Sequence, residues 1–128
     1  MTDHHLTLSV LPDGMAVCRL AGDAALPSWA LESPFCSITR TADELSVVVR
    51  EAVVPGSVPC ECGWRALEVA GQLDFSMTGV LASLAGPLAE AGISIFVLST
   101  FKTDYVLVKE ADLARAIDTL TNAGHEIG

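Results

Sequence analysis

Short runs in which apolar and polar residues alternate predict several β-strands. Leu6, Leu8 and Val10 alternate with polar residues, and Pro12-Asp13-Gly14 then predicts a turn, so that residues 6–20 are expected to form a hairpin. The same pattern predicts strands at residues 36–40, 45–50 and 64–70. The first part of the chain is therefore expected to be rich in strands, with one short helical turn at residues 27–30.

A different spacing follows, in which apolar residues recur at steps of three and four. Residues 79–91 are expected to form a helix, and its apolar face consists of Leu81, Leu84, Leu88 and Ala91. Thr78 is a candidate N-cap and Gly92 a candidate left-handed C-terminal residue. Pro87 lies inside this helix and is expected to kink it. A second helix is expected at residues 112–123.

Strands are also predicted at residues 93–99, 105–109 and 125–127. The second half then has the order β-α-β-β-α-β, which is the ferredoxin-like arrangement of an α+β protein.

The two halves share a sequence repeat. Residues 47–52 (VVVREA) reappear as residues 106–111 (VLVKEA), an offset of 106 − 47 = 59 positions. Residues 55–59 (PGSVP) interrupt the pattern and predict a linker. We therefore predict a degenerate N-terminal half at residues 1–54, a linker at 55–63 and a C-terminal domain at 64–128; chance similarity of two apolar strands is the alternative.

Composition and charge narrow the class of protein. A net charge of −9, with seven basic residues that form no cluster, argues against nucleic acid and anionic membranes as partners. Neither an export signal nor an apolar run long enough to span a membrane is found, so a cytoplasmic location is expected. With no phosphate loop, nucleophile elbow or paired histidine motif, the chain is not expected to be an enzyme or to carry a cofactor.

Cys60-Glu61-Cys62 is a candidate metal or redox pair. The spacing is CxC rather than CxxC, and no second pair of ligands completes a zinc site. An ordinary connecting segment is the favoured interpretation, and no metal is expected.

One stretch has the character of a small-ligand site. The free amides at the start of the helix, near Thr78 and Gly79, suit a carboxylate. The end of the next strand, with Thr100 and Phe101, is expected near the same place, and Asp104 offers a charge for an ammonium group. A free amino acid needs both receptors; plain capping and turn formation by the same residues is the alternative.

Residues 75–81 (FSMTGVL) and 97–108 (VLSTFKTDYVLV) resemble an ACT domain, in the subfamily of tandem ACT proteins that contains the animal cytosolic arginine sensors. This resemblance covers residues 65–127 well, and residues 40–46 fit the degenerate first half of that family. It implies paired ferredoxin-like units that hold an amino acid at the interface between units. It also implies that Thr100, Phe101 and Asp104 help to hold the ligand.

Met77 stands where the arginine sensors carry a Glu that receives the basic side chain. A neutral or apolar amino acid is therefore expected rather than arginine. Taken together, the sequence predicts a non-catalytic, regulatory protein that binds an amino acid or related metabolite and forms a homodimer. The alternative is an interaction or oligomerisation module of the same fold that has lost its ligand.

Overall fold

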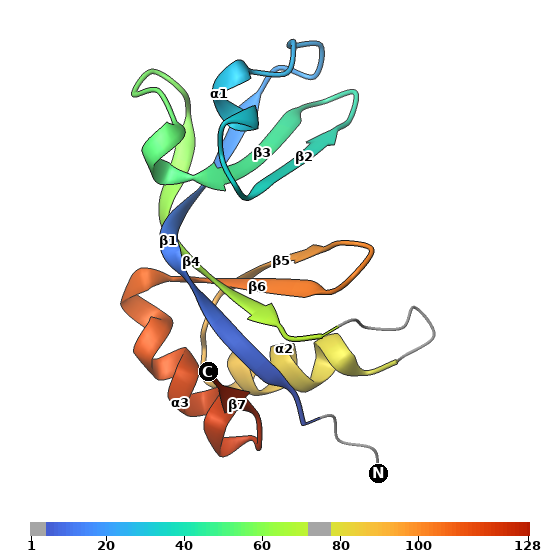
Figure 1. Cartoon of the computed structure of the whole chain (residues 1–128), viewed down its shortest axis with the longest axis vertical. Helices are drawn as coiled ribbons and strands as arrows, with labels where there is room; N and C mark the ends of the chain where they lie inside the picture. Colours follow the sequence, from blue (N-terminus) through green and yellow to red (C-terminus); the bar gives the residue numbers. More distant parts are fainter. Residues whose placement is uncertain (1–4, 72–77) are drawn as a thin grey trace. The chain divides into compact units, whose positions relative to one another are not determined.

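The computed structural model describes residues 5–71 and 78–128 (Figure 1). Its strands are β1 (Thr7–Leu20), β2 (Cys36–Arg40), β3 (Leu45–Arg50), β4 (Cys60–Val69), β5 (Ile95–Ser99), β6 (Asp104–Lys109) and β7 (Glu126–Ile127). Its α-helices are α1 (Ser28–Leu31), α2 (Val80–Glu90) and α3 (Leu113–Asn122), and η1 (Glu51–Val53) and η2 (Glu110–Asp112) are short 3₁₀ helices. None of the helices in the described ranges is long and apolar enough to cross a membrane.

The chain folds into two compact units that are interleaved along the sequence. The split unit consists of Met1–Pro12 and Arg65–Gly128, and the inserted unit consists of Asp13–Trp64. Strands β1 and β4 each contribute residues to both units. Residues 5–12, which were predicted to belong to the N-terminal half, thus pack with the C-terminal residues.

The split unit has the expected ferredoxin-like order of β4, α2, β5, β6, α3 and β7. Its strands are arranged β1-β4-β6-β5, with the short β7 parallel to the start of β1. Both helices lie on one side of these strands (Figure 1). Alternate residues of the strands meet the helices in one core, formed by Leu8, Leu67, Val69, Leu84, Leu88, Ile93, Val106, Val108, Ala116 and Leu120.

Helix α2 ends as the sequence predicts. Gly92 has a φ of +74°, which a residue with a side chain rarely adopts. The amide of Ile93 donates to the carbonyl of Leu88 at 2.9 Å, and that of Gly92 donates to Ala89 at 3.0 Å. These two bonds satisfy carbonyls that the last turn would otherwise leave exposed, and they form a Schellman motif.

The inserted unit is built on antiparallel pairs of β1 with β3 and of β3 with β2. Its core contains Ala16, Cys18, Ala30, Leu45, Val47 and Val49. In the split unit, β6 is followed by η2 and then by the helix α3. In the inserted unit, β3 is followed by η1 and then by an irregular segment up to β4.

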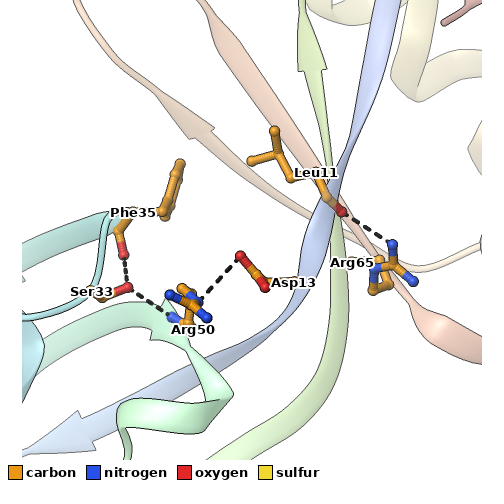
Figure 2. A network of polar contacts seen from close by, with 6 residues as sticks. All are labelled: Leu11, Asp13, Ser33, Phe35, Arg50 and Arg65. Carbon is orange, nitrogen blue, oxygen red and sulfur yellow. Dashed lines mark hydrogen bonds and ion pairs between the residues drawn. The ribbon is translucent and has the colours of Figure 1, made fainter.

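The predicted hairpin at residues 6–20 is wrong, because β1 runs unbroken from Thr7 to Leu20. Within the inserted unit, Arg50 forms an ion pair with Asp13 at 3.2 Å, and its amide donates to Ser33 Oγ at 3.1 Å (Figure 2). Within the split unit, Arg65 Nη2 donates to the carbonyl of Leu11 at 3.1 Å (Figure 2). The two stretches of β1 are thus tied to different long-range partners, which keep Pro12-Asp13-Gly14 extended.

The start of β4 also differs from the prediction. β4 begins at Cys60 rather than at residue 64, so the Cys60-Glu61-Cys62 segment is part of a strand and not a connection. The amide of Arg19 on β1 donates to the carbonyl of Pro59 at 3.1 Å, which holds the start of β4 in place.

Substitution of Gly22 by alanine is expected to destabilise the inserted unit by about 1–3 kcal/mol, the usual cost of overpacking. A Cβ atom at Gly22 would lie 2.9 Å from the carbonyl carbon of Ala42 and 3.0 Å from the carbonyl oxygen of Thr41. Because both atoms belong to the backbone of the β2–β3 turn, no side chain can rotate away. Gly56→Ala is the matched control, since a Cβ there would meet nothing within 4 Å. Urea unfolding of the two variants checks this, and equal midpoints would contradict it.

Candidate functional site

The turn between β5 and β6 is closed by Thr100. Its amide donates to the carbonyl of Thr103 at 2.9 Å. Its hydroxyl oxygen accepts from the amides of Lys102 at 3.3 Å and Thr103 at 3.2 Å. The same hydroxyl lies 3.2 Å from the carbonyl of Thr103, to which it donates. The Thr100 side chain therefore defines the shape of the turn.

Asp104 begins β6 directly after this turn and faces Ser99 across the strand pair. Ser99 Oγ donates to Asp104 Oδ1 at 2.7 Å. This bond fixes the rotation of the half-buried carboxylate, so its negative charge has a defined position at the base of the turn.

A residue that the sequence analysis did not single out ties the turn to the neighbouring strand. Thr103 is only 2% exposed, and its hydroxyl donates to the carbonyl of Val69 at 2.7 Å. Val69 is the last residue of β4, the strand from which the chain runs on towards α2. A threonine in a turn is too common for the sequence alone to identify this role.

Helix α2 begins differently from the prediction. Gly79, not Thr78, is the N-cap residue, with a φ of +78° and no side-chain capping bond. The left-handed backbone at Gly79 explains why glycine is suited to this position. The carbonyl of Gly79 accepts the first helical bond, from the amide of Ser83 at 3.0 Å. The positive end of the helix dipole lies at this point.

The structure thus divides the predicted site residues between two elements of the split unit. Thr100, Phe101 and Asp104 share the β5–β6 turn, and Phe101 at its tip is 75% exposed. Thr78 and Gly79 lie at the entry to α2. Met77 falls outside the described residues.

The inserted unit contains a matching turn 59 positions earlier. The amide of Thr41 donates to the carbonyl of Glu44 at 2.9 Å, and its hydroxyl accepts from the amides of Asp43 and Glu44, both at 3.2 Å. β2 and β5, β3 and β6, and η1 and η2 are displaced by the same number (95 − 36 = 104 − 45 = 110 − 51 = 59). Leu45, which is fully buried, occupies the position that corresponds to Asp104. Of these two turns, only the one in the split unit carries a carboxylate there.

Tyr105 follows Asp104 and faces a second carboxylate. Its hydroxyl donates to Glu68 Oε2 at 3.0 Å. Burial, together with the nearby Glu68 charge, raises the pKa of Tyr105, so the phenol stays protonated at neutral pH. In the part of the chain that the structure describes, His, Cys, Asp and Glu side chains form no group of three that could hold a metal ion.

Known protein families and solved structures resemble this chain. Residues 60–122 match the family model described as ACT domain, and a second model, described as an N-terminal domain, matches residues 13–57. The crystal structure of protein Atu0741 from Agobacterium tumefaciens is 39% identical, with a TM-score of 0.92, over 98% of this chain and 93% of that one.

Two further proteins resemble this chain, the first in sequence and the second in fold alone. The cytosolic arginine sensor for mTORC1 subunit 1 from Bos taurus is 39% identical over 66 residues, which are 51% of this chain and 20% of the sensor. This chain therefore spans about a fifth of the sensor's length. The regulatory subunit of aspartate kinase from Thermus thermophilus has the same fold, with a TM-score of 0.61 and 12% identity over 91% of this chain and 96% of that one. The chain belongs to the ACT-domain family and is related to the cytosolic arginine sensors.

Proposed function

We propose that this protein is a non-catalytic, regulatory protein that binds a free amino acid or a closely related metabolite. The observation that carries the proposal is the Asp104 carboxylate, fixed by Ser99 at the base of a turn that Thr103 ties to β4. An oriented carboxylate beside a rigid turn suits the ammonium group of an amino acid. The relationship to a protein named as a cytosolic arginine sensor supports both this ligand class and a cytoplasmic location.

The parts of the ligand would be received by different elements. Asp104 binds the ammonium group, and the backbone amides that follow Thr78 and Gly79 bind the carboxylate at the positive end of the α2 dipole. Thr100 acts through the turn that its hydroxyl closes, and Phe101 forms a wall of the site. The ligand is proposed to have a neutral or apolar side chain, because Met77, which lies outside the described residues, offers no charge for a guanidinium group.

The ligand would be held at an interface between two ACT units. We propose that the inserted unit is a degenerate first copy of the split unit, because their β2–β3 and β5–β6 turns share the same bonds at a constant offset of 59 positions. Its turn carries Leu45 in place of an acid, so it would not bind an ammonium group in the same way. The second face of the site is proposed to come from another ACT unit.

Thermal unfolding of the purified protein against each common amino acid tests the proposal. A ligand at about 100 times its Kd stabilises the folded state by about 2.7 kcal/mol. For a chain of this size, that corresponds to an increase of several degrees in Tm. We expect one amino acid, or a small group with neutral side chains, to raise the Tm.

The N-acetyl and carboxamide derivatives of the same amino acid are the matched ligand controls. Each removes one of the two charges that the site is proposed to bind, so neither is expected to raise the Tm. If no amino acid has an effect, ligand binding is wrong and the fold serves as an interaction or oligomerisation module.

A further inference from the structure

Three cysteines of the inserted unit, Cys18, Cys60 and Cys62, lie together. Cys60 and Cys62 on β4 are exposed, and their Sγ atoms are 3.4 Å apart. Cys18 on β1 is buried, and nearby Cys60 and Cys62 contribute to the rise in the pKa of its thiol. All of these residues are thiols in the structure.

The strand explains why the two exposed thiols meet. Residues two apart on a strand point to the same face. Their Cα atoms are separated by about 6.6 Å, which lies inside the range of about 4.4–6.8 Å that disulfides span. Gly63 follows Cys62 with a φ of +82°, and a Cβ there would meet nothing within 4 Å.

Cys18 differs from this pair in reactivity. Burial, with smaller contributions from Cys60 and Cys62, raises the pKa of Cys18 to about 12. The thiolate is the nucleophile in disulfide exchange, so Cys18 remains an unreactive thiol at neutral pH. Reaction is therefore confined to the two exposed sulfur atoms.

We propose that Cys60 and Cys62 form a reversible dithiol–disulfide site that is oxidised by low-molecular-weight disulfides. One thiolate of the pair attacks a sulfur atom of the small disulfide, forms a mixed disulfide and releases one small thiolate. The second thiolate of the pair then attacks the protein sulfur and releases the other. The protein loses two electrons and two protons, and the small disulfide gains them to become two thiols.

The proximity of the pair determines which product accumulates. A mixed disulfide on Cys60 or Cys62 has the second thiol beside it, at the high effective concentration of an intramolecular reaction. It is therefore expected to close to the Cys60–Cys62 disulfide. Cys36, which is also exposed, lies on β2 opposite Val49 and is expected to keep the small thiol as an adduct.

Incubation of the reduced full-length protein with glutathione disulfide tests this, followed by alkylation and peptide mass spectrometry. We expect wild type and Cys36→Ser both to lose the alkylation sites at Cys60 and Cys62 through a disulfide. Wild type is also expected to lose the site at Cys36 through its glutathione adduct, and dithiothreitol to restore every lost site. Cys60→Ser and Cys62→Ser are expected to carry one glutathione on the remaining cysteine of the pair. These variants keep the test valid without any change of fold, because serine is close to cysteine in size.

Three results would overturn the proposal. The first is a stable glutathione adduct on Cys60 or Cys62 in the wild type. The second is a disulfide that joins Cys18 to either residue. The third is retention of both alkylation sites under conditions in which Cys36 is modified.

Discussion

Substitution of His125 by alanine is expected to lower the free energy of unfolding by about 2–6 kcal/mol, since each buried polar group left without a partner costs about 1–3 kcal/mol. The imidazole is only 3% exposed and bonds to two backbone groups of the split unit. The amide of Leu6 donates to Nδ1 at 3.0 Å, and Nε2 lies 3.0 Å from the carbonyl of Ser83. These partners require a neutral ring that carries its proton on Nε2.

Pro87 explains why this bond to Ser83 matters. In an uninterrupted helix the carbonyl of Ser83 would accept from the amide of residue 87, but proline has no amide hydrogen. Helix α2 nevertheless runs through Pro87 from Val80 to Glu90. His125 supplies the missing donor from outside the helix, and this contact offsets part of the cost of an internal proline.

A double-mutant cycle with Pro87→Ala isolates this contact. Alanine at position 87 returns an amide that can donate to Ser83, so His125→Ala should then leave only the Leu6 amide unpaired. We expect the loss caused by His125→Ala, measured by urea unfolding, to be smaller by about 1–3 kcal/mol in that background. An equal loss in both backgrounds would show that His125 does not replace the proline bond.

His5→Ala is the matched control for the removal of a histidine. His5 is exposed and its Nδ1 lies 3.0 Å from the carbonyl of Gly124. Because water can replace this contact, a change within about 0.5 kcal/mol is expected, as for most surface substitutions.

The parts of the fold that depend on neighbouring residues were predictable from the sequence. The spacing of Leu84 and Leu88 marks the buried face of α2, and Gly92 marks its end, because periodicity and left-handed glycine act over a few residues. Leu81, which was predicted on the same face, is instead 39% exposed. The ACT resemblance was confirmed by the family model at residues 60–122.

The errors arose where distant residues decide the local structure. Pro12-Asp13-Gly14 has the composition of a turn, but Asp13 pairs with Arg50 and Leu11 with Arg65, and these partners follow from the fold as a whole. In the same way, β4 begins at Cys60 because the carbonyl of Pro59 accepts from Arg19. No short sequence pattern predicts such long-range contacts.

In the candidate site, too, features set by neighbouring residues were predictable and features set by distant residues were not. The sequence predicts Asp104 and the entry to α2 as candidate site residues, since charge and glycine position can be read locally, and their ligand contacts stay a prediction. It did not identify Ser99 or Thr103 as supports, because each acts through a bond to a residue that only the folded sheet brings near. The capping role predicted for Thr78 was wrong, since the left-handed Gly79 takes the N-cap position.

Asp104→Ala is expected to weaken amino-acid binding by about ten- to a hundredfold. A hydrogen bond to a charged group is worth about 1.5–3 kcal/mol, and each 1.4 kcal/mol changes Kd about tenfold. The substitution removes the carboxylate that would receive the ammonium group, while the amides at the start of α2 remain. Isothermal titration with the amino acid found by the Tm screen measures the change.

Asp104→Asn separates charge from shape. The asparagine side chain keeps an oxygen that can accept from Ser99 Oγ, which lies 2.7 Å from Asp104 Oδ1 in the wild type, but it carries no charge. If the charge receives the ammonium group, Asn and Ala should weaken binding to a similar extent, and Ser99→Ala, which only frees the carboxylate to rotate, should weaken it less. If Asn binds as tightly as the wild type, Asp104 supports the turn and the ammonium group is received elsewhere. Full affinity in Asp104→Ala would remove Asp104 from the site altogether.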